Sequence, residues 1–193
     1  MSWIKDHAVD HPLQLPPNPI PERFREAKLS KIENEAVRTV VVKYLTHFEA
    51  YATKGVAPSF LGKGGTYKSF GAGLIADRLY RQALLPLEYV ACASQMAELE
   101  RARYDAATSK FLRRLRTTPF LIMDDFTQIK LGTWTTDMLL EIADARYNAL
   151  LPTMWTGNLF ISKEDQSSLI NGYGVSFARR LMEGSKGLIV VNR

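Results

Sequence analysis

The sequence has few of the residues and segments that mark secreted, membrane or zinc-binding proteins. Its one cysteine, Cys92, excludes a disulfide within the chain. The three histidines are scattered, and no group of Cys and His has the spacing of a structural zinc site. No apolar run approaches the roughly 20 residues that a membrane helix needs, and the first residues do not resemble a secretory signal. We therefore expect a cytoplasmic protein with no membrane partner.

What remains is the composition of a globular protein. The 193 residues are 46% hydrophobic and 23% charged, which suffices for one domain with its own core. The net charge of +5 is compatible with a nucleic-acid partner but does not identify one. Residues 1–21 are rich in proline, which predicts an extended, irregular arm. We interpret this arm as a tail in preference to a docking strap, and residues 22–193 as one domain.

Strand-like and helix-like segments alternate along the domain. A capping box at Ser30 and Glu33 predicts a first helix that ends near Gly55. Short apolar runs predict strands at 56–61, 87–93, 120–123, 153–156 and 188–191. Helical periodicity marks 68–83, 94–103, 108–116, 134–148, 163–170 and 175–182. The alternation predicts an α/β fold whose parallel sheet has helices on both faces and its functional loops at the carboxyl ends of the strands.

A phosphate-binding loop is indicated after the first strand. The loop consists of Gly62, Lys63, Gly64, Gly65, Thr66, Tyr67, Lys68 and Ser69, and it fits G-x-x-x-x-G-K-[ST] except at Tyr67. Its backbone N–H groups would cradle phosphates, Lys68 would neutralise them, and Ser69 would ligate Mg²⁺. Tyr67 must either adopt a strained positive φ or keep an ordinary φ with its ring outside the loop. A glycine loop that only turns the chain is the alternative.

Polar residues follow two later strands. Asp124 and Asp125 end the strand at 120–123, where a metal–phosphate site needs carboxylates. We predict that Asp124 holds Mg²⁺ through water and that Asp125 polarises the attacking water. Asn158 follows the strand at 153–156 and is suited to orienting that water. Each feature alone also fits an ordinary turn, but an acidic strand end downstream of a phosphate loop is much more specific.

Two groups of basic residues are candidates for other roles. Arg180 lies in a helix near the end of the sequence and is suited to stabilising phosphate charge in a neighbouring subunit, although cations are common near helix ends. A basic region with Tyr104 and Phe111 among its residues suits single-stranded nucleic acid, or else forms a solvated helix face. Its candidate contacts are Arg101, Arg103, Lys110, Arg113 and Arg114.

The order of these motifs over residues 20–193 resembles AAA+ ATPases of the DnaC/DnaI/IstB type. Residues 20–24 resemble the segment that flanks adenine in these proteins, which implies a nucleotide contact for Phe24. We also expect a nucleotide contact for Phe70, which directly follows the phosphate loop. The other matching segments are 62–69 (Walker A), 121–126 (Walker B), 134–148 (the following helix), 156–159 (sensor 1), 180–184 (the arginine-finger helix) and the closing strand with Arg193. The resemblance implies a P-loop NTPase core that uses ATP and Mg²⁺.

The resemblance also implies partners. Such proteins assemble head to tail into rings or spirals with ATP between subunits. Loaders deliver a replicative helicase to single-stranded DNA, whereas IstB-type relatives assist a transposase. A scaffold that hydrolyses ATP poorly is a third hypothesis. Three features depart from the family: Tyr67 replaces a glycine, Ser176 stands where many relatives have an arginine, and only the proline arm precedes the core. The second departure favours Arg180 as the arginine finger. The third means that helicase, if it binds directly, binds at another surface, which the sequence does not identify.

Overall fold

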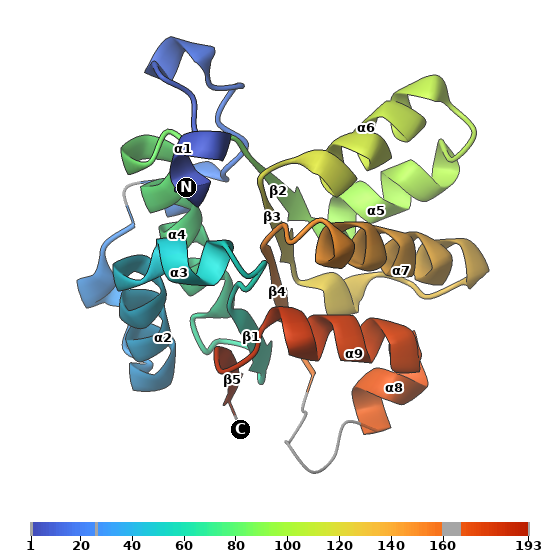
Figure 1. Cartoon of the computed structure of the whole chain (residues 1–193). Helices are drawn as coiled ribbons and strands as arrows, with labels where there is room; N and C mark the ends of the chain where they lie inside the picture. Colours follow the sequence, from blue (N-terminus) through green and yellow to red (C-terminus); the bar gives the residue numbers. More distant parts are fainter. Residues whose placement is uncertain (1, 26, 160–166, 193) are drawn as a thin grey trace.

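A five-stranded parallel sheet forms the centre of the molecule (Figure 1). The computed structural model describes residues 2–25, 27–159 and 167–192. The strands are β1 (Ser59–Gly62), β2 (Leu87–Ala91), β3 (Phe120–Asp124), β4 (Thr153–Gly157) and β5 (Ile189–Asn192), in the order β2-β3-β4-β1-β5. All residues of β1, β3 and β4 are buried, which explains their apolar composition. Because the strands are parallel, the loops after β1, β3 and β4 lie at one edge of the sheet.

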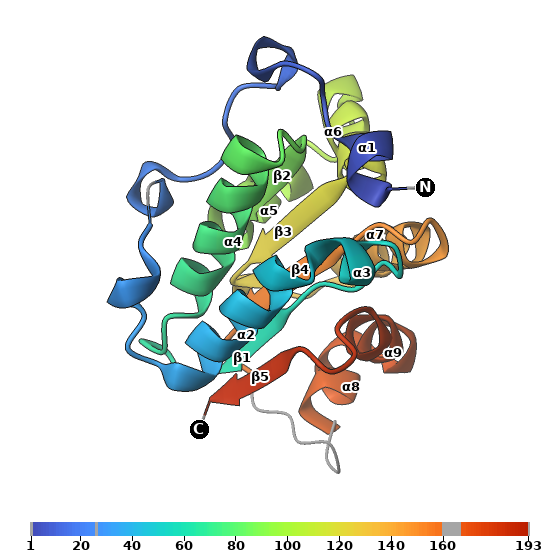
Figure 2. The same cartoon turned by 60° about the vertical axis from the view of Figure 1, so that its left-hand side comes forward.

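Helices cover both faces of the sheet, as expected (Figure 2). One face carries α2 (Glu35–Thr46), α3 (Phe48–Ala52) and α4 (Lys68–Gln82). The other carries α5 (Cys92–Arg101), α6 (Ala106–Thr117), α7 (Thr133–Asn148), α8 (Ser167–Tyr173) and α9 (Val175–Gly184). Separate hydrophobic clusters fill the two spaces, with Tyr44 and Phe120 in the first and Trp155 and Phe177 in the second. Within the described residues, none of the helices combines the length and hydrophobicity that a bilayer crossing requires.

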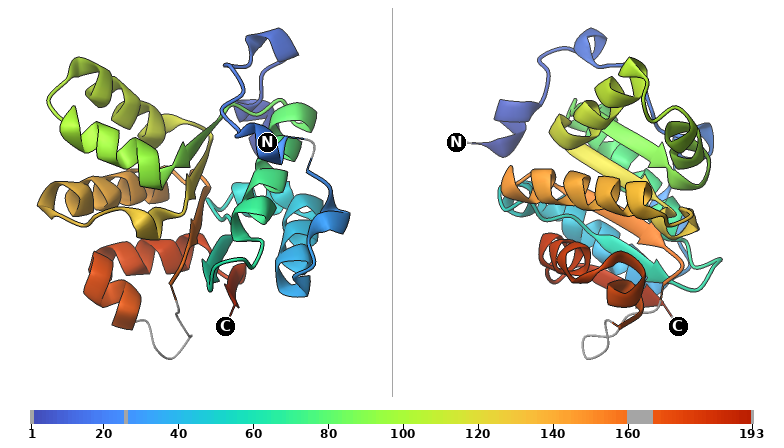
Figure 3. Two further views of the ribbon diagram at one scale, coloured as in Figure 1. Left: turned by 180° about the vertical axis from the view of Figure 1, so that it is seen from behind. Right: turned by 90° about the vertical axis from the view of Figure 1, so that its right-hand side faces the viewer.

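The pair α5 and α6 forms a helical hairpin that projects from the rest of the molecule (Figure 3). Its two helices are joined by a short turn at residues 102–105. On the same face, α7 lies beside α6, and α9 packs against α7. The predicted helix at 163–170 lies partly outside the described residues, and α8 begins at Ser167.

The proline-rich arm is irregular over much of its length, as expected, but it is not a free tail. It contains the short helix α1 (Trp3–His7), and Trp3 stacks on His7 and meets Phe48 of α3 edge-on at 5.6 Å. Further along, the Tyr80 hydroxyl of α4 donates to the carbonyl of Pro16 at 2.7 Å. The arm is therefore strapped onto the domain, because its apolar side chains complete the cluster on the α4 face. The division of the chain at residue 21 stays a prediction.

Three other sequence expectations were wrong in detail. The first long helix begins at Glu35, because Asn34 accepts the Val37 N–H at 3.1 Å, and residues 29–31 form only a 3₁₀ turn. This helix ends at Thr46 and a separate α3 follows, so Gly55 does not terminate one continuous helix. Cys92 is buried as expected, but it begins α5 and does not belong to a strand.

Candidate functional site

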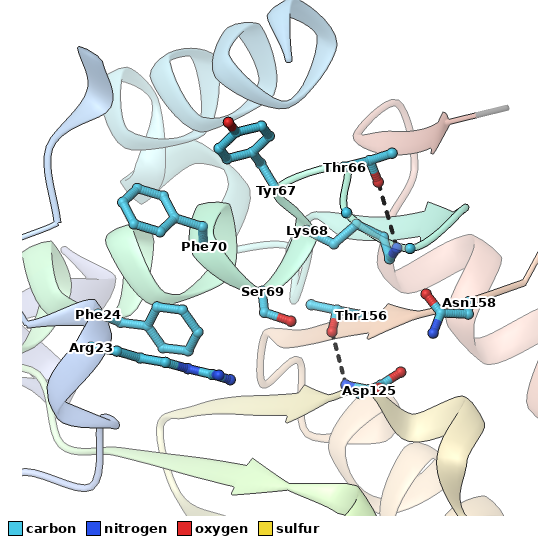
Figure 4. A pocket seen from close by; sticks show the side chains of 12 residues that line it. Arg23, Phe24, Thr66, Tyr67, Lys68, Ser69, Phe70, Asp125, Thr156 and Asn158 are labelled. Atoms are coloured by element: carbon cyan, nitrogen blue, oxygen red, sulfur yellow. Dashed lines mark hydrogen bonds between the residues drawn. The ribbon is translucent and has the colours of Figure 1, made fainter. Parts of the chain in front are cut away.

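A pocket of about 340 Å³ opens at the carboxyl ends of β1, β3 and β4 (Figure 4). It brings together the loop after β1, the first turn of α4, the acidic end of β3 and the polar end of β4. The lining residues are Arg23, Phe24, Gly64, Gly65, Thr66, Tyr67, Lys68, Ser69, Phe70, Asp125, Thr156 and Asn158. Most of the residues predicted for nucleotide binding and hydrolysis therefore share one pocket.

The loop folds around the Lys68 side chain. Its Nζ atom donates to the carbonyl oxygens of Gly62 at 2.9 Å and Lys63 at 2.6 Å, so these two residues hold the lysine although they do not line the pocket. Burial lowers the pKa of Lys68, and the carboxylates of Asp125 and Asp124 oppose that shift. A cation is thus fixed where the glycine-rich loop meets the N-terminus of α4, which is the arrangement of a phosphate site.

Tyr67 occupies the loop position where the motif has glycine. Its φ of 64° and ψ of 17° are left-handed, so the first of the two alternatives for its backbone is correct. Its ring nevertheless leaves the loop, as the second alternative proposed, and lies edge-on to Phe70 at 6.4 Å (Figure 4). A hydrogen bond with the Glu33 carboxylate raises the pKa of the Tyr67 hydroxyl. The ring therefore lies outside the loop, although Tyr67 itself belongs to the pocket lining.

The acidic strand end is tied to β4 by a threonine. The Thr156 hydroxyl donates to Asp124 at 2.5 Å and accepts the Asp125 N–H at 2.8 Å. Asp124 is only 5% exposed, whereas Asp125, at a left-handed φ of 56°, lines the pocket. Burial and the neighbouring Asp124 raise the pKa of Asp125, and Lys68 opposes this shift. The two carboxylates thus have different surroundings, one buried behind the pocket and one facing it.

The oxygen ligands predicted for Mg²⁺ are Ser69 and Asp124. Ser69 lines the pocket, and its hydroxyl points toward Thr156 in Figure 4. The described residues contain no group of three or more His, Cys, Asp or Glu side chains that could hold a metal by themselves. Mg²⁺ prefers oxygen and commonly takes one or two protein ligands together with phosphates and water. The residues therefore fit Mg²⁺ that binds with a nucleotide, and not an independent metal site.

An aromatic wall closes the pocket on the side of the N-terminal segment. Phe24 meets Phe70 edge-on at 6.2 Å, and the Arg23 guanidinium lies 4.5 Å from the centre of the Phe24 ring. A side chain at Gly73 would approach Phe24 to 2.5 Å, so this glycine lets Phe24 sit directly on α4. Arg23 and Thr156 were not predicted as site residues. Both lie within motifs that the sequence identified, but their orientation depends on tertiary packing.

Arg180 does not lie in this pocket. Its Nε atom is 2.5 Å from Asp144, and its guanidinium lies 4.3 Å from the centre of the Tyr147 ring. It lines a different hollow together with Thr153, the first residue of β4. Because Thr153 marks the amino end of β4 and the pocket lies at the carboxyl ends of the strands, Arg180 faces away from this pocket.

The predicted nucleic-acid contacts are distributed over the α5–α6 hairpin. Arg103 lies 4.9 Å from the ring of Tyr104, which is 87% exposed at the hairpin tip. Arg114 differs from the others, because its Nε atom pairs with Glu88 at 2.5 Å. Lys110 and Arg113 are exposed and form no ion pair with the part of the chain that the structure describes. All five predicted cations are therefore exposed on the hairpin. Two of them also bind within the domain: Arg114 pairs with Glu88, and Arg101 bonds to its own helix through the Ala97 carbonyl.

Comparison with known proteins places this arrangement in a structural class. No protein-family model matches the sequence, and no curated protein is significantly similar to it. The crystal structure of the DnaC helicase loader superposes with a TM-score of 0.76 at 19% identity, covering 90% of this chain and 100% of that one. A DnaI structure superposes with a TM-score of 0.71 at 20% identity, covering 89% of this chain and 93% of that one. The chain has the AAA+ fold of DnaC and DnaI.

This DnaC/DnaI-type fold confirms the predicted P-loop architecture. The replication initiator DnaA, in a structure bound to AMPPCP and single-stranded DNA, has a TM-score of 0.68 at 13% identity. The match covers 89% of this chain but only 50% of that DnaA chain. At such low identities, the superpositions establish the fold alone. The roles of individual residues depend on the geometry of the pocket.

Proposed function

We propose that the protein binds ATP with Mg²⁺ in the pocket at the carboxyl edge of the sheet and hydrolyses it. The observation that carries the proposal is the convergence of a buried lysine and a carboxylate, Lys68 and Asp125, on one pocket at the N-terminus of α4. The similar DnaA structure contains AMPPCP, an ATP analogue, which supports nucleotide binding by this fold.

Each pocket residue has a role in this proposal. Backbone N–H groups of Gly64 and Gly65 face the phosphates, and the Lys68 ammonium exchanges loop carbonyls for phosphate oxygens. Ser69 would ligate Mg²⁺, and Asp124, buried behind the pocket, would hold the ion through a water; the bound ion would neutralise phosphate charge. Asp125 takes the proton of the attacking water as the water oxygen joins the γ-phosphorus and the bond to ADP breaks.

We further propose a role in DNA replication, in which the protein delivers a replicative helicase to single-stranded DNA. The similarity to a helicase loader and to a DnaA structure that contains single-stranded DNA supports this role. The exposed cations and Tyr104 of the α5–α6 hairpin suit phosphate contacts and base stacking. Self-assembly into a ring or spiral would bring Arg180, which faces away from its own pocket, to the pocket of a neighbour.

A nucleotide-binding scaffold with poor hydrolysis is the second candidate. Two observations favour it: the left-handed backbone of Tyr67 in the phosphate loop and the two loop carbonyls that hold Lys68. Both raise the free energy required to seat the phosphates. Turnover of ATP by the purified protein separates this candidate from the first.

The decisive variant is Asp125→Asn, compared with the parent and with Arg180→Ala. Asp125→Asn should bind ATP as tightly as the parent and lose turnover by a factor of about a hundred or more, because the water loses its base. Arg180→Ala should lose only the turnover that depends on a neighbouring subunit. Mixing Arg180→Ala with Asp125→Asn should restore part of the activity, because some interfaces then have both residues intact. Unchanged turnover in Asp125→Asn would contradict the assigned role. Addition of single-stranded DNA and capture of purified replicative helicase test the partners in the same preparations.

A further inference from the structure

Thr127 joins the catalytic ends of β3 and β4. Its hydroxyl accepts the N–H of Asn158 at 2.8 Å and lies 3.4 Å from Oδ1 of Asp125, to which it donates. The pairing register of these two strands runs to Met123 opposite Trp155. Beyond that point, threonine hydroxyls supply the connection between the strands, through Thr156, which lines the pocket, and through Thr127, which contacts two other lining residues, Asp125 and Asn158.

The backbone of β4 is shaped to allow this contact. A Cβ atom at Gly157 would lie 2.6 Å from Cγ2 and 3.1 Å from Oγ1 of Thr127. Such an approach is shorter than side chains tolerate, so only glycine lets the end of β4 lie directly against Thr127. The hydroxyl thereby reaches the next residue, Asn158, within hydrogen-bond distance.

The support beneath Thr127 is rigid. Its neighbour Phe126 is fully buried and packs against the rings of Trp155, Tyr173 and Phe177 at 5.4, 5.1 and 5.9 Å. The 3₁₀ turn η4 (Phe126–Gln128) that carries Thr127 is therefore fixed to the core of the α7–α9 face. A short β-branched side chain on such a turn has little freedom, so its hydroxyl holds a constant position between the two polar residues.

We propose that Thr127 is a positioning residue that holds Asp125 and Asn158 in one fixed arrangement around the attacking water. This inference rests on the proposed ATP hydrolysis and adds a residue to its machinery. Thr127 touches neither nucleotide nor water in this account and acts only through its two partners. Its loss should therefore lower kcat and leave nucleotide affinity unchanged, because the phosphate loop and the aromatic wall are not altered.

The test compares Thr127→Val, Thr127→Ser and the parent. Valine keeps the shape and removes the hydroxyl, whereas serine keeps the hydroxyl. We expect Thr127→Val to lower kcat roughly ten- to hundredfold with the ATP dissociation constant changed less than about twofold. Thr127→Ser should restore most of the activity. Thr53→Val is the matched control, since the Thr53 hydroxyl donates to the Glu49 carbonyl at an exposed site remote from the pocket.

Amide hydrogen exchange gives a readout that does not depend on turnover. The Asn158 N–H should exchange about tenfold faster in Thr127→Val than in the parent or in Thr127→Ser, because its acceptor is lost. Full turnover in Thr127→Val, or an unchanged Asn158 exchange rate, would overturn the proposal. A parent protein without turnover would refute the proposed hydrolysis, and with it the positioning role, while faster exchange would still establish the hydrogen bond. The two failures are thus distinguishable.

Discussion

The backbone of Tyr67 adopts a conformation that glycine adopts freely and tyrosine rarely does. Two contacts compensate for it: the edge-on packing against Phe70 and the hydrogen bond with Glu33. The sequence left two alternatives here, a strained left-handed backbone or an ordinary φ with the ring outside the loop, because the motif normally has glycine at this position. It did not predict the compensation, because Glu33 and Phe70 meet the ring only after α2 and α4 have packed together.

At Tyr67, replacement by glycine should tighten ATP binding up to about tenfold, since the left-handed backbone then costs little. Tyr67→Phe keeps the backbone strain and the ring but removes the hydroxyl, so it should bind ATP like the parent. Calorimetric titration of the three proteins with ATP and Mg²⁺ measures the difference. If Tyr67→Gly binds no better than the parent, the contacts with Phe70 and Glu33 matter more than the strain.

At the scale of elements, Arg146 joins α6, α7 and β4. Its side chain is 1% exposed and donates to the carbonyls of Leu115, Thr118 and Pro152 at 2.9, 2.7 and 2.8 Å. A fourth bond, from Nε to the Thr153 hydroxyl, measures 2.7 Å. Burial lowers the pKa of Arg146 to about 9, so the guanidinium remains charged at neutral pH. One side chain therefore fixes the base of the α5–α6 hairpin to the sheet.

Arg146→Met should lower the free energy of unfolding by about 3 kcal/mol or more, because buried carbonyls lose their donor. Urea denaturation measures this loss, and hydrogen exchange should show faster opening at the end of α6. Arg116→Met is the control, since its ion pair with Glu141 is partly exposed and should contribute about 1 kcal/mol or less. Equal losses in the two variants would show that Arg146 does not have this clamping role.

Periodicity predicted most elements of the sheet and its covering helices, because burial on a parallel sheet imposes strong patterns. The errors had two causes. At the first long helix one local signal replaced another, because Asn34 and not Ser30 caps the helix. In the arm, tertiary contacts overrode the local signal, because Trp3 and Ile20 pack into the core despite the prolines. The pocket was predictable because its motifs follow strands. Thr127 was not, because its partner Asn158 is far away in sequence and only the sheet brings the two together.

At the scale of the whole molecule, the proposed nucleotide pocket and the α5–α6 hairpin are separate features of one sheet. β2 leads directly into α5, and α6 leads into β3, which ends in the aspartates of the pocket. The hairpin is therefore inserted between two strands next to the site. In the proposed function, this connection is the path by which nucleotide in the pocket would affect DNA at the hairpin.

The double variant Lys110→Glu with Arg113→Glu should weaken binding to single-stranded DNA. The slope of log K against log salt concentration should become shallower by roughly one to two, since each phosphate contact contributes about 0.7 to that slope. Arg114 is left unchanged, because its ion pair with Glu88 supports the hairpin itself. Lys43→Glu with Lys54→Glu makes the same change of charge on exposed residues elsewhere. Fluorescence anisotropy at several salt concentrations gives both quantities. An equal slope in the two double variants would place the DNA site off the hairpin.

The central claim, that this pocket binds ATP through a lysine held in its phosphate loop, is tested most directly by calorimetric titration with ATP and Mg²⁺. The parent should bind one nucleotide per chain. Lys68→Ala should weaken that binding about a hundredfold, because a charged contact to phosphate is lost. Lys54→Ala, which removes a cation away from the pocket, should bind like the parent. Absence of binding by the folded parent, or equal affinity in Lys68→Ala, would contradict the account.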